Sequence, residues 1–355
     1  MDEAIENPSN PTADRKVQHI AIIREDDGVD RRKFYFDDIR LTHRALPEIA
    51  LRDVDPSINF LGKKLSFPLL ISCMTGGSHE RVRRINRNLA AAAEAEQVAM
   101  GVGSQRVMFG SNDARSSFAL RDAAPTVPLL GNLGAVQLNE GFGVEHAREA
   151  VSVLAADALV FHLNPLQEAV QPEGDTNFTG LAEKIGAVVR ALAPTPVIVK
   201  EVGAGISLAD ARLLTAQGIR YIDVAGSGGT SWSRIEHHRQ DAGPDQHDVG
   251  LVFQDWGIPT PLALRNLGSL RPDTTLIASG GIRSGLDMVK SVVLGASLAG
   301  LAKPFLEPAL ESVEAVRDVI RRLRREFTTA MFLLGAGNIH DVHGREDLIC
   351  SRPWK

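Results

Sequence analysis

Short apolar runs recur along the chain, each bounded by polar residues or glycines. Most of them lack the alternation of a half-exposed strand, as expected for strands that are buried on both faces. Between the runs, apolar residues return every three or four positions, which indicates helices with one buried face. The runs that predict strands are Pro68–Cys73, Ala99–Val102, Leu129–Leu130, Ala158–Phe161, Pro196–Val199, Tyr221–Val224, Thr275–Ala278 and Leu298–Leu301.

Helix start and stop signals lie between these runs. Ser207 and Ser284 are placed to cap helix N-termini, and Gly218 and Gly295 to end the same helices. Eight strand–helix units favour a closed (β/α)8 TIM barrel over an open doubly wound sheet, which usually has fewer strands. The predicted helices are Arg81–Gln97, Val144–Ala155, Thr179–Ala191, Ser207–Gln217, Ser284–Leu294 and a closing helix at about Val313–Leu334.

The predicted barrel takes up residues 66–340, and no break in composition divides it. Residues 1–65 precede it as an extension that caps the barrel, and residues 341–355 form a tail. Within the extension, we interpret Arg31, Arg32 and Lys33 as solvated charge on a loop. The connection 226–259 has little periodicity, which is typical of a lid or an assembly contact.

Composition narrows the class of function. The 355 residues are 44% apolar and 23% charged, and the formal net charge of -5 argues against bulk binding of nucleic acid. No apolar run approaches the roughly 18 residues of a membrane span. The two cysteines, Cys73 and Cys350, lie far apart, so we expect no disulfide framework and a reducing, cytoplasmic location.

The carboxyl ends of parallel barrel strands meet at one rim, which brings distant residues into one site. The richest strand end follows Ala158–Phe161, where the apolar run opens into His162, Asn164, Gln167 and Glu168. Clustered imidazole, amide and carboxylate groups at the mouth of a barrel are typical of an enzyme.

Two neighbouring strand ends predict a phosphate site. The segment Gly280–Gly285 opens a helix after the seventh strand, and Ala302 and Lys303 end the eighth. Glycines let a phosphate approach backbone N–H groups, and a helix N-terminus adds a favourable dipole. This is also the usual phosphate position in such barrels.

Lys200 ends an otherwise apolar strand, and a buried ammonium needs an anion beside it. One interpretation is a structural ion pair with Glu201 or with a neighbouring strand. Others are a cation beside an electron-rich ring or a phosphate, and a Schiff-base lysine.

The first and third strand ends offer a bed for a planar ring. Met74, Thr75 and Gly76 present a hydroxyl and a flat glycine surface, although the same residues also suit a plain turn. Asn132 either offers an amide to a ring edge or braces its own turn. A metal site at Glu236, His237 and His238 is not favoured, because no further ligand lies at usable spacing.

Together these blocks resemble the type 2 isopentenyl-diphosphate isomerases, flavoenzymes that interconvert isopentenyl and dimethylallyl diphosphate. Single glycine motifs are shared with other flavin barrels, whereas the His162–Glu168 block is more specific. The resemblance extends from about residue 15 to 338. Its blocks are Arg15-Lys16 with His19, Met74–Gly77, Ser104–Arg106, Gly131–Gly134, His162–Glu168, Val199–Gly203, Gly226–Trp232, Asp255–Gly257, Gly280–Arg283 and Ala302–Pro304.

The resemblance implies reduced FMN as cofactor, Mg2+, a reductant such as NADPH, and a homo-oligomer that is a tetramer or larger. Gln167 would face the reacting carbons, and Glu168 would bind Mg2+. The residues that would hold FMN are Met74, Thr75, Gly76, Ser104, Asn132, Lys200, Thr230, Gly281, Arg283, Ala302 and Lys303. Those that would line the diphosphate substrate are Arg15, Lys16, His19, Ser104, Gln105, Arg106, Asn164 and Gln167.

The chemistry of a double-bond shift is consistent with this assignment. One proton must reach an unactivated alkene carbon and another must leave, yet the rim offers no dedicated acidic pair or thiol. A redox-neutral reaction that takes its proton donor from a reduced flavin explains why no such acid is found among the rim residues. We hypothesise that Gln167 is a weak base beside a carbocation-like centre; alternatively, it orients the diphosphate or the Mg2+ shell.

Two other functions remain open. An FMN-dependent 2-hydroxyacid oxidase uses a similar barrel and needs a His/Arg pair, for which the sixth connection offers His237 and Arg239. The second alternative is a barrel that only binds a phosphorylated ligand and catalyses no reaction. Such a binder has little reason to keep Gln167 and Glu168 beside a flavin-like bed.

Overall fold

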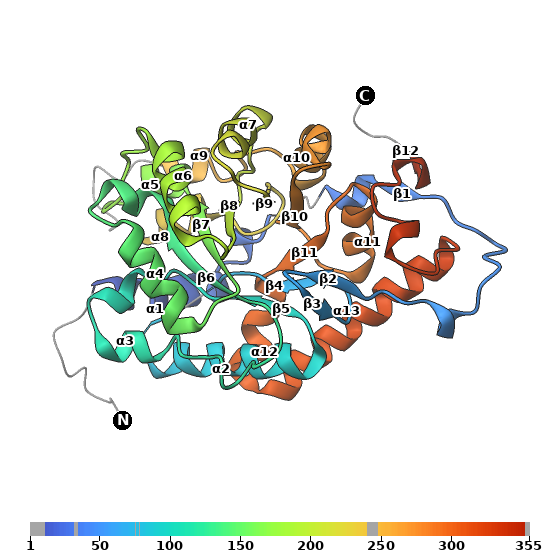
Figure 1. Cartoon of the computed structure of the whole chain (residues 1–355), viewed down its shortest axis with the longest axis horizontal. Helices are drawn as coiled ribbons and strands as arrows, with labels where there is room; N and C mark the ends of the chain where they lie inside the picture. Colours follow the sequence, from blue (N-terminus) through green and yellow to red (C-terminus); the bar gives the residue numbers. More distant parts are fainter. Residues whose placement is uncertain (1–10, 32–34, 75, 78, 240–247, 352–355) are drawn as a thin grey trace.

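A closed barrel of eight parallel strands, surrounded by helices, forms the centre of the molecule (Figure 1). The computed structural model describes residues 11–31, 35–74, 76–77, 79–239 and 248–351. The strands follow one another around the barrel in chain order, and every predicted strand is present. They are β4 (Leu69–Ile71), β5 (Ala99–Gly101), β6 (Leu129–Gly134), β7 (Ala158–Leu163), β8 (Val197–Glu201), β9 (Tyr221–Asp223), β10 (Thr275–Ser279) and β11 (Leu298–Leu301).

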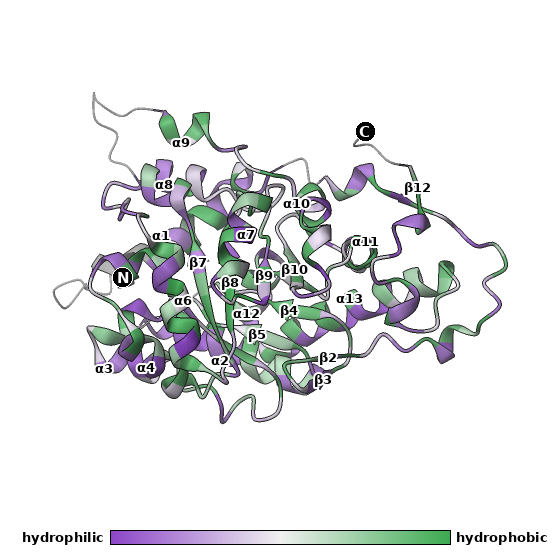
Figure 2. Ribbon diagram, turned by 45° about the horizontal axis from the view of Figure 1, so that its top comes forward, coloured by the Kyte–Doolittle hydropathy of each residue, from purple (hydrophilic) through white to green (hydrophobic). Residues whose placement is uncertain are grey.

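The strands are apolar on both faces because both faces are buried, as Figure 2 shows by their hydrophobic colouring. Leu70 of β4 packs inside the barrel, whereas Leu69 and Ile71 pack outward against the helices. A hairpin of β2 (Ile58–Phe60) and β3 (Lys63–Leu65) adds Phe60 and Leu65 to the inner cluster. This double burial explains why the strands showed no alternation of polar and apolar residues.

The predicted helices are confirmed with end shifts of one or two residues. Ser207 and Ser284 cap their helices, accepting from Asp210 N at 3.1 Å and Asp287 N at 3.2 Å. The helices are α1 (Pro11–Glu25), α2 (Glu80–Glu96), α3 (Asn112–Ser116), α4 (Val144–Leu154), α5 (Pro165–Val170), α6 (Leu181–Leu192), α7 (Leu208–Ala216), α8 (Trp232–Arg239), α9 (Val249–Val252), α10 (Thr260–Asn266), α11 (Gly285–Val293), α12 (Leu306–Glu311) and α13 (Val313–Leu333).

The connection 226–259 differs from the expected irregular loop, because it contains α8 and α9. The buried residues of α8 are Ser233, Ile235, Glu236 and His237, so its inner face is mostly polar. A helix of that kind has no apolar stripe, which is why hydrophobic periodicity did not reveal it. Residues 240–247 of this connection lie outside the described part of the chain.

The N-terminal extension lies against the barrel rather than apart from it. Its helix α1 contacts α8, and strand β1 (Arg40–Leu41) pairs with β12 (Ile349–Ser351) of the C-terminal tail. The prediction of solvated charge is wrong for Arg31, which is buried and donates to the carbonyls of Gly203 and Gln254, both at 2.8 Å. Arg32 and Lys33 lie outside the described residues.

Within the described residues, no helix combines the length and the apolar character that a membrane crossing requires.

Candidate active site

Two adjoining cavities open at the carboxyl ends of the strands. The first, of about 1100 Å³ with its open mouth, is bounded by the glycine loops 226–230 and 280–282, and is called here the glycine cavity. The second, of about 820 Å³, is bounded by Asn132, Asn164 and Gln167, and is called the amide cavity. The wall between them is shared and consists of Lys16, His19, Cys73, Met74, Lys200, Val202 and Trp232.

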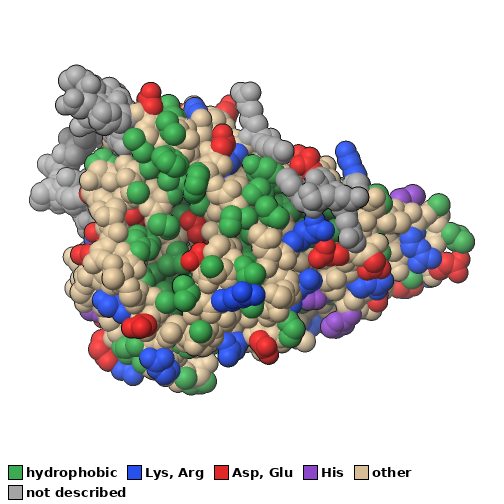
Figure 3. All heavy atoms as spheres, turned by 90° about the horizontal axis from the view of Figure 1, so that it is seen from above, with side chains coloured by type: hydrophobic (Ala, Val, Ile, Leu, Met, Phe, Trp, Pro, Cys, Tyr) green, Lys and Arg blue, Asp and Glu red, His purple; other side chains and the backbone are tan. Residues whose placement is uncertain are grey.

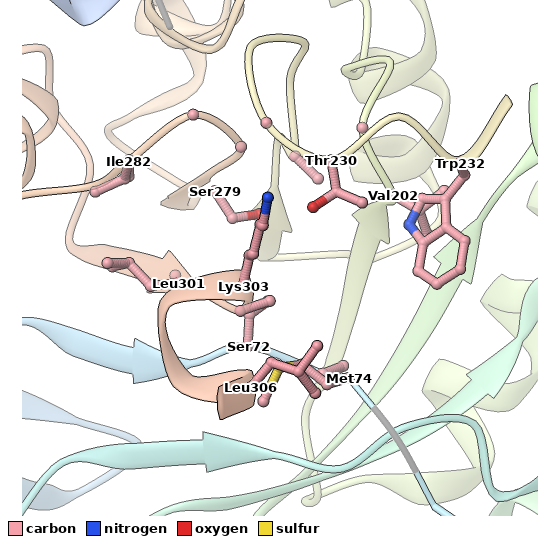
Figure 4. A pocket seen from close by; sticks show the side chains of 18 of the residues that line it. Ser72, Met74, Val202, Thr230, Trp232, Ser279, Ile282, Leu301, Lys303 and Leu306 are labelled. Carbon is pink, nitrogen blue, oxygen red and sulfur yellow. The ribbon is translucent and has the colours of Figure 1, made fainter. Parts of the chain in front are cut away.

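The glycine cavity has a backbone floor. A Cβ atom at Gly229 would lie 2.7 Å from the N atom of Gly281, so the two glycine loops touch and only glycine fits there. Gly281 itself has a φ of +77°, in the region that favours glycine. Figure 4 shows Met74 and Leu306 on one side of this cavity and Thr230 on another. The result is a flat bed with apolar walls.

Positive charge lies at the glycine-loop end of this cavity. Arg283 and Lys303 both line it, and Ala302 lies beside them. Both cations pair with one carboxylate, that of Asp30, to which Arg283 donates and from which Lys303 Nζ lies 3.3 Å away. Asp30 belongs to the N-terminal extension and was not anticipated from the sequence.

The expected contribution of a helix N-terminus needs correction. The backbone N–H groups of Arg283 and Ser284 donate to Asp287 Oδ2, both at 3.1 Å, and that of Gly285 donates to Glu326 Oε2 at 2.7 Å. These donors at the start of α11 are therefore occupied within the protein. An anion at this end would rely on the glycine turn and on the side-chain cations.

Lys200 is buried in the wall that separates the two cavities. Its Nζ lies 3.6 Å from Asp223 Oδ2 on the neighbouring strand β9 and donates to Ser279 Oγ at 3.3 Å. This is the structural ion pair with a neighbouring strand, and it disfavours a Schiff-base role. Lys200 still lines both cavities. Nearby, burial raises the pKa of the Cys73 thiol to about 12, so this thiol stays protonated near neutral pH.

In the amide cavity, the side chain of Gln167 is held at both ends. Its Nε2 donates to Glu236 Oε1 at 2.7 Å, and its Oε1 accepts from Asn164 Nδ2 at 3.1 Å. Gln167 and Asn164 come from the start of α5, where Pro165 occupies the first turn. The two hydrogen bonds fix the orientation of the amide and show which end is the oxygen and which is the nitrogen.

Glu236 is a second functional candidate, after Asp30, that the sequence analysis missed. It is fully buried on α8 and lies 3.1 Å from His19 Nε2, and Arg239 also donates to it. Burial raises its pKa, but the hydrogen bonds from His19, Gln167 and Arg239 and the charge of His19 prevail and lower the pKa to about 2. The side chain is therefore a carboxylate across the physiological range. The i,i+3 spacing of Glu236 and Arg239 was the available signal.

Glu168 lies at the base of the amide cavity in a ring of amides. Its carboxylate accepts from Asn164 Nδ2 at 2.9 Å, from Gln171 Nε2 at 2.5 Å and from the backbone N–H of Asp175 at 2.8 Å. The buried oxygens Asn164 Oδ1 and Gln171 Oε1 have no hydrogen-bond partner within the described part of the chain. Asn164, Glu168 and Gln171 line the same cavity, and carboxylate and amide oxygens are the types of ligand that a hard divalent cation takes.

Other residues of the expected substrate set also line the amide cavity. Lys16 Nζ donates to Gly76 O and, at 3.1 Å, to Ser104 O. Arg106 points its guanidinium to Asp175, with 3.0 Å between NH1 and Oδ2. The side chain of Arg15 and the whole of Thr75 lie outside the described residues.

Two residues that were expected to contact a ligand, Gln105 and Gly76, lie behind the cavity wall instead. Gln105 is fully buried, donates to Ala150 O at 2.9 Å and accepts from Asn132 N at 3.0 Å, so it braces β6 and lines neither cavity. Asn132 does line the amide cavity, and its Oδ1 lies 2.8 Å from His162 Nδ1. Gly76 also lines neither cavity, and a Cβ atom there would collide with the Phe118 ring.

The His/Arg pair that an oxidase requires is not presented to these cavities. Arg239 is engaged by Glu236 and by Glu173, the latter at 2.6 Å. Neither His237 nor Arg239 lines either cavity within the described residues.

Comparison with known proteins places this chain in a family. Residues 167–349 match the profile of the FMN-dependent dehydrogenases. An isopentenyl-diphosphate delta-isomerase from Paracoccus zeaxanthinifaciens is 55% identical over 95% of this chain and 97% of its own length. The isopentenyl-diphosphate delta-isomerase of Hydrogenovibrio crunogenus is 51% identical over 96% and 98%. That of a Nostoc species is 46% identical over 96% and 97%.

Solved structures agree on the fold. A flavocytochrome b2 variant with sulfite bound superposes with a TM-score of 0.67 at 17% identity, over 94% of this chain and 82% of that one. A mandelate oxidase gives a TM-score of 0.62 at 18% identity, over 94% and 97%. At such identities the likeness concerns the barrel alone.

Proposed function

The chain belongs to the isopentenyl-diphosphate delta-isomerases, and we propose that it interconverts isopentenyl and dimethylallyl diphosphate with FMN in the glycine cavity and Mg2+ beside Glu168. The isomerase activity follows from relatives that are 51% and 55% identical over nearly the whole chain. The observation that carries the proposal is the pair of adjoining cavities, one with a flat glycine bed and one with a fixed amide.

The residues of the glycine cavity fit FMN. Met74, Thr230 and Gly281 would surround the ring and ribityl chain, while Arg283 and Lys303 would attract the phosphate. Lys200 would place its ammonium in the wall that faces the ring. Contrary to the sequence-based expectation, the Cys73 thiol does lie in the cavity wall, but its raised pKa makes it a poor proton donor. When bound, reduced FMN would supply the acid for the alkene carbon.

The residues around Glu168 fit Mg2+. This ion keeps several waters and is usually bound through one or two carboxylates together with phosphate oxygens of the substrate. The oxygens Asn164 Oδ1 and Gln171 Oε1, which lack a hydrogen-bond partner among the described residues, support a cation at this position. Arg106 and Lys16, which line the same cavity, would bind the remaining charge of the diphosphate.

Gln167 would accept or pass the proton that leaves the substrate. A neutral amide is a weak base, but a proton next to a carbocation-like centre is very acidic. Glu236 acts as a positioning residue, because its carboxylate holds Gln167 Nε2 and His19 Nε2. Gln167 lines the amide cavity, and its oxygen, which accepts one hydrogen bond from Asn164 Nδ2, has a second lone pair with which it would take up the proton.

The reductant and the assembly belong to the same proposal. NADPH would reduce the flavin, and the protein would act in the cytoplasm, where its two free cysteines stay reduced. Hydrophobic side chains gather around a hollow on the face formed by α5, α7 and α9 (Figure 3). On this face Trp256 is 61% exposed and Val252 74% exposed, which supports an interface between copies of this chain. The size proposed for the assembly, a tetramer or larger, is what the resemblance implies.

An absorbance spectrum of the purified protein tests the cofactor. We expect a yellow protein whose flavin is released by denaturation and is identified as FMN. A colourless protein that takes up no added FMN would refute the proposed cofactor site.

A further inference from the structure

The charged end of the glycine cavity already contains an anion of the protein. Asp30 accepts from the guanidinium of Arg283, whose Nε lies 3.3 Å from Oδ2, and Lys303 Nζ lies 3.3 Å from the same oxygen. The three side chains are between 18% and 27% exposed. The two cations that would attract a flavin phosphate therefore share one internal carboxylate.

Asp30 is held in place by its backbone. It forms an isolated antiparallel bridge with Thr230, which lines the glycine cavity. On either side, Arg31 N donates to Gly229 O at 3.2 Å, and Ser231 N donates to Val29 O at 2.8 Å. The carboxylate is thus fixed at the cavity by a short ladder to the glycine loop, and is not carried by a free loop.

The net charge of the side chains at this end of the glycine cavity determines how Asp30 affects the binding of a phosphate. Arg283, Lys303 and Asp30 together carry one net positive charge, whereas a phosphate monoester brings about -1.5 to -2. With Asp30 present, the complex is left with excess negative charge in a partly buried place. Without that carboxylate, the two cations would nearly neutralise the phosphate.

We propose that Asp30 competes with the flavin phosphate for Arg283 and Lys303, and so weakens the binding of FMN without affecting riboflavin. This inference rests on the proposed FMN site. The N-terminal extension, which lies on the rim, would thus tune the affinity for the phosphorylated flavin through a residue outside the barrel.

The test compares two ligands on one pair of proteins. FMN and riboflavin carry the same ring, and only FMN has the phosphate, so each is titrated by flavin fluorescence against wild type and Asp30→Asn. The neutral amide keeps the shape and can still accept from Arg283. We expect FMN to bind about tenfold more tightly to the variant, which is the effect of one charge at a partly exposed site. Riboflavin affinity should stay unchanged, which also reports an intact flavin bed.

Two controls define the result. Asp37→Asn removes the same charge from an exposed position of the same extension and should alter neither affinity. Lys303→Met removes one of the two cations, so the gain from Asp30→Asn should shrink in that background. A gain of equal size there would contradict competition for Lys303.

The outcomes separate this inference from the one on which it rests. A wild-type protein that binds no FMN refutes the proposed cofactor site. If wild type binds FMN, but Asp30→Asn weakens FMN or changes both ligands by the same factor, only the competition is overturned. An unchanged ratio of the two affinities overturns it as well.

Discussion

The glycine cavity and the amide cavity share a wall, yet they are built from different parts of the chain. The glycine cavity takes its bed from strand ends and tight loops of the barrel, such as Gly229 and Gly281. The amide cavity depends on side chains, and Gln167 is positioned by Glu236 of α8. In the proposed function, the backbone shape of the glycine cavity would hold the planar flavin, and the hydrogen-bonded side chains of the amide cavity would carry out the proton transfer.

Both cavities nevertheless receive polar side chains from outside the eight strand–helix units. Asp30 of the N-terminal extension pairs with the cations of the glycine cavity. His19 of α1 lines the amide cavity and lies 3.1 Å from Glu236 behind it. The barrel positions the two cavities, and residues of the added segments change the electrostatic environment of each cavity. The two cavities should consequently respond to different substitutions.

The largest effect should follow Gln167→Asn, which changes the amide cavity and leaves the residues of the glycine cavity unchanged. Shortening the side chain by one methylene withdraws the proton partner, so kcat should fall about 100-fold with little change in KM. FMN and Mg2+ affinities should stay as in wild type. Steady-state kinetics decide the matter: a normal kcat with a raised KM would show that Gln167 only binds substrate.

Glu168→Gln separates metal binding from flavin binding. The amide keeps the shape and loses the charge that a hard cation needs, so the Mg2+ concentration for half-maximal activity should rise at least tenfold. The FMN absorbance of the purified variant should not change. An unaltered Mg2+ titration would make Glu168 a structural residue.

Glu236→Gln tests the positioning role directly. Loss of the carboxylate loosens both Gln167 and His19, and we expect kcat to fall about tenfold at constant FMN content. Glu173→Gln is the matched control, because Glu173 also pairs with Arg239 but is half exposed. Equal losses in the two variants would assign the effect to Arg239 instead.

The smallest effect concerns stability in acid. Because the pKa of Glu236 drops from 4.5 unfolded to about 2 folded, its contribution to stability is present above pH 4.5 and is lost as the pH falls toward 2. Between pH 5 and pH 3, wild type should lose about 1 to 2 kcal/mol more than Glu236→Gln. Urea unfolding at both pH values measures this, and parallel losses would show that Glu236 is not a stabilising carboxylate.

The contrast between the cavities also explains what the sequence could predict. Strands and glycine loops were found because apolar runs and glycines mark them locally, and the cluster from His162 to Glu168 is contiguous. Helix α8 was not found, because its buried face carries Ser233 and Glu236 in place of an apolar stripe.

Long-range pairs leave no such local mark. Arg31 was expected in solvent, but its partners are backbone carbonyls of Gly203 and Gln254, about 170 and 220 residues away along the chain. The pairing of Asp30 with Lys303 is of the same kind. Such contacts become visible only when the barrel brings the segments together.

One measurement tests the central claim most directly: anaerobic incubation of the pre-reduced, FMN-loaded protein with Mg2+ and isopentenyl diphosphate. We predict that dimethylallyl diphosphate accumulates over many turnovers while the flavin spectrum remains that of the reduced form. No product, or oxidation of the flavin in proportion to the substrate consumed, would contradict the account.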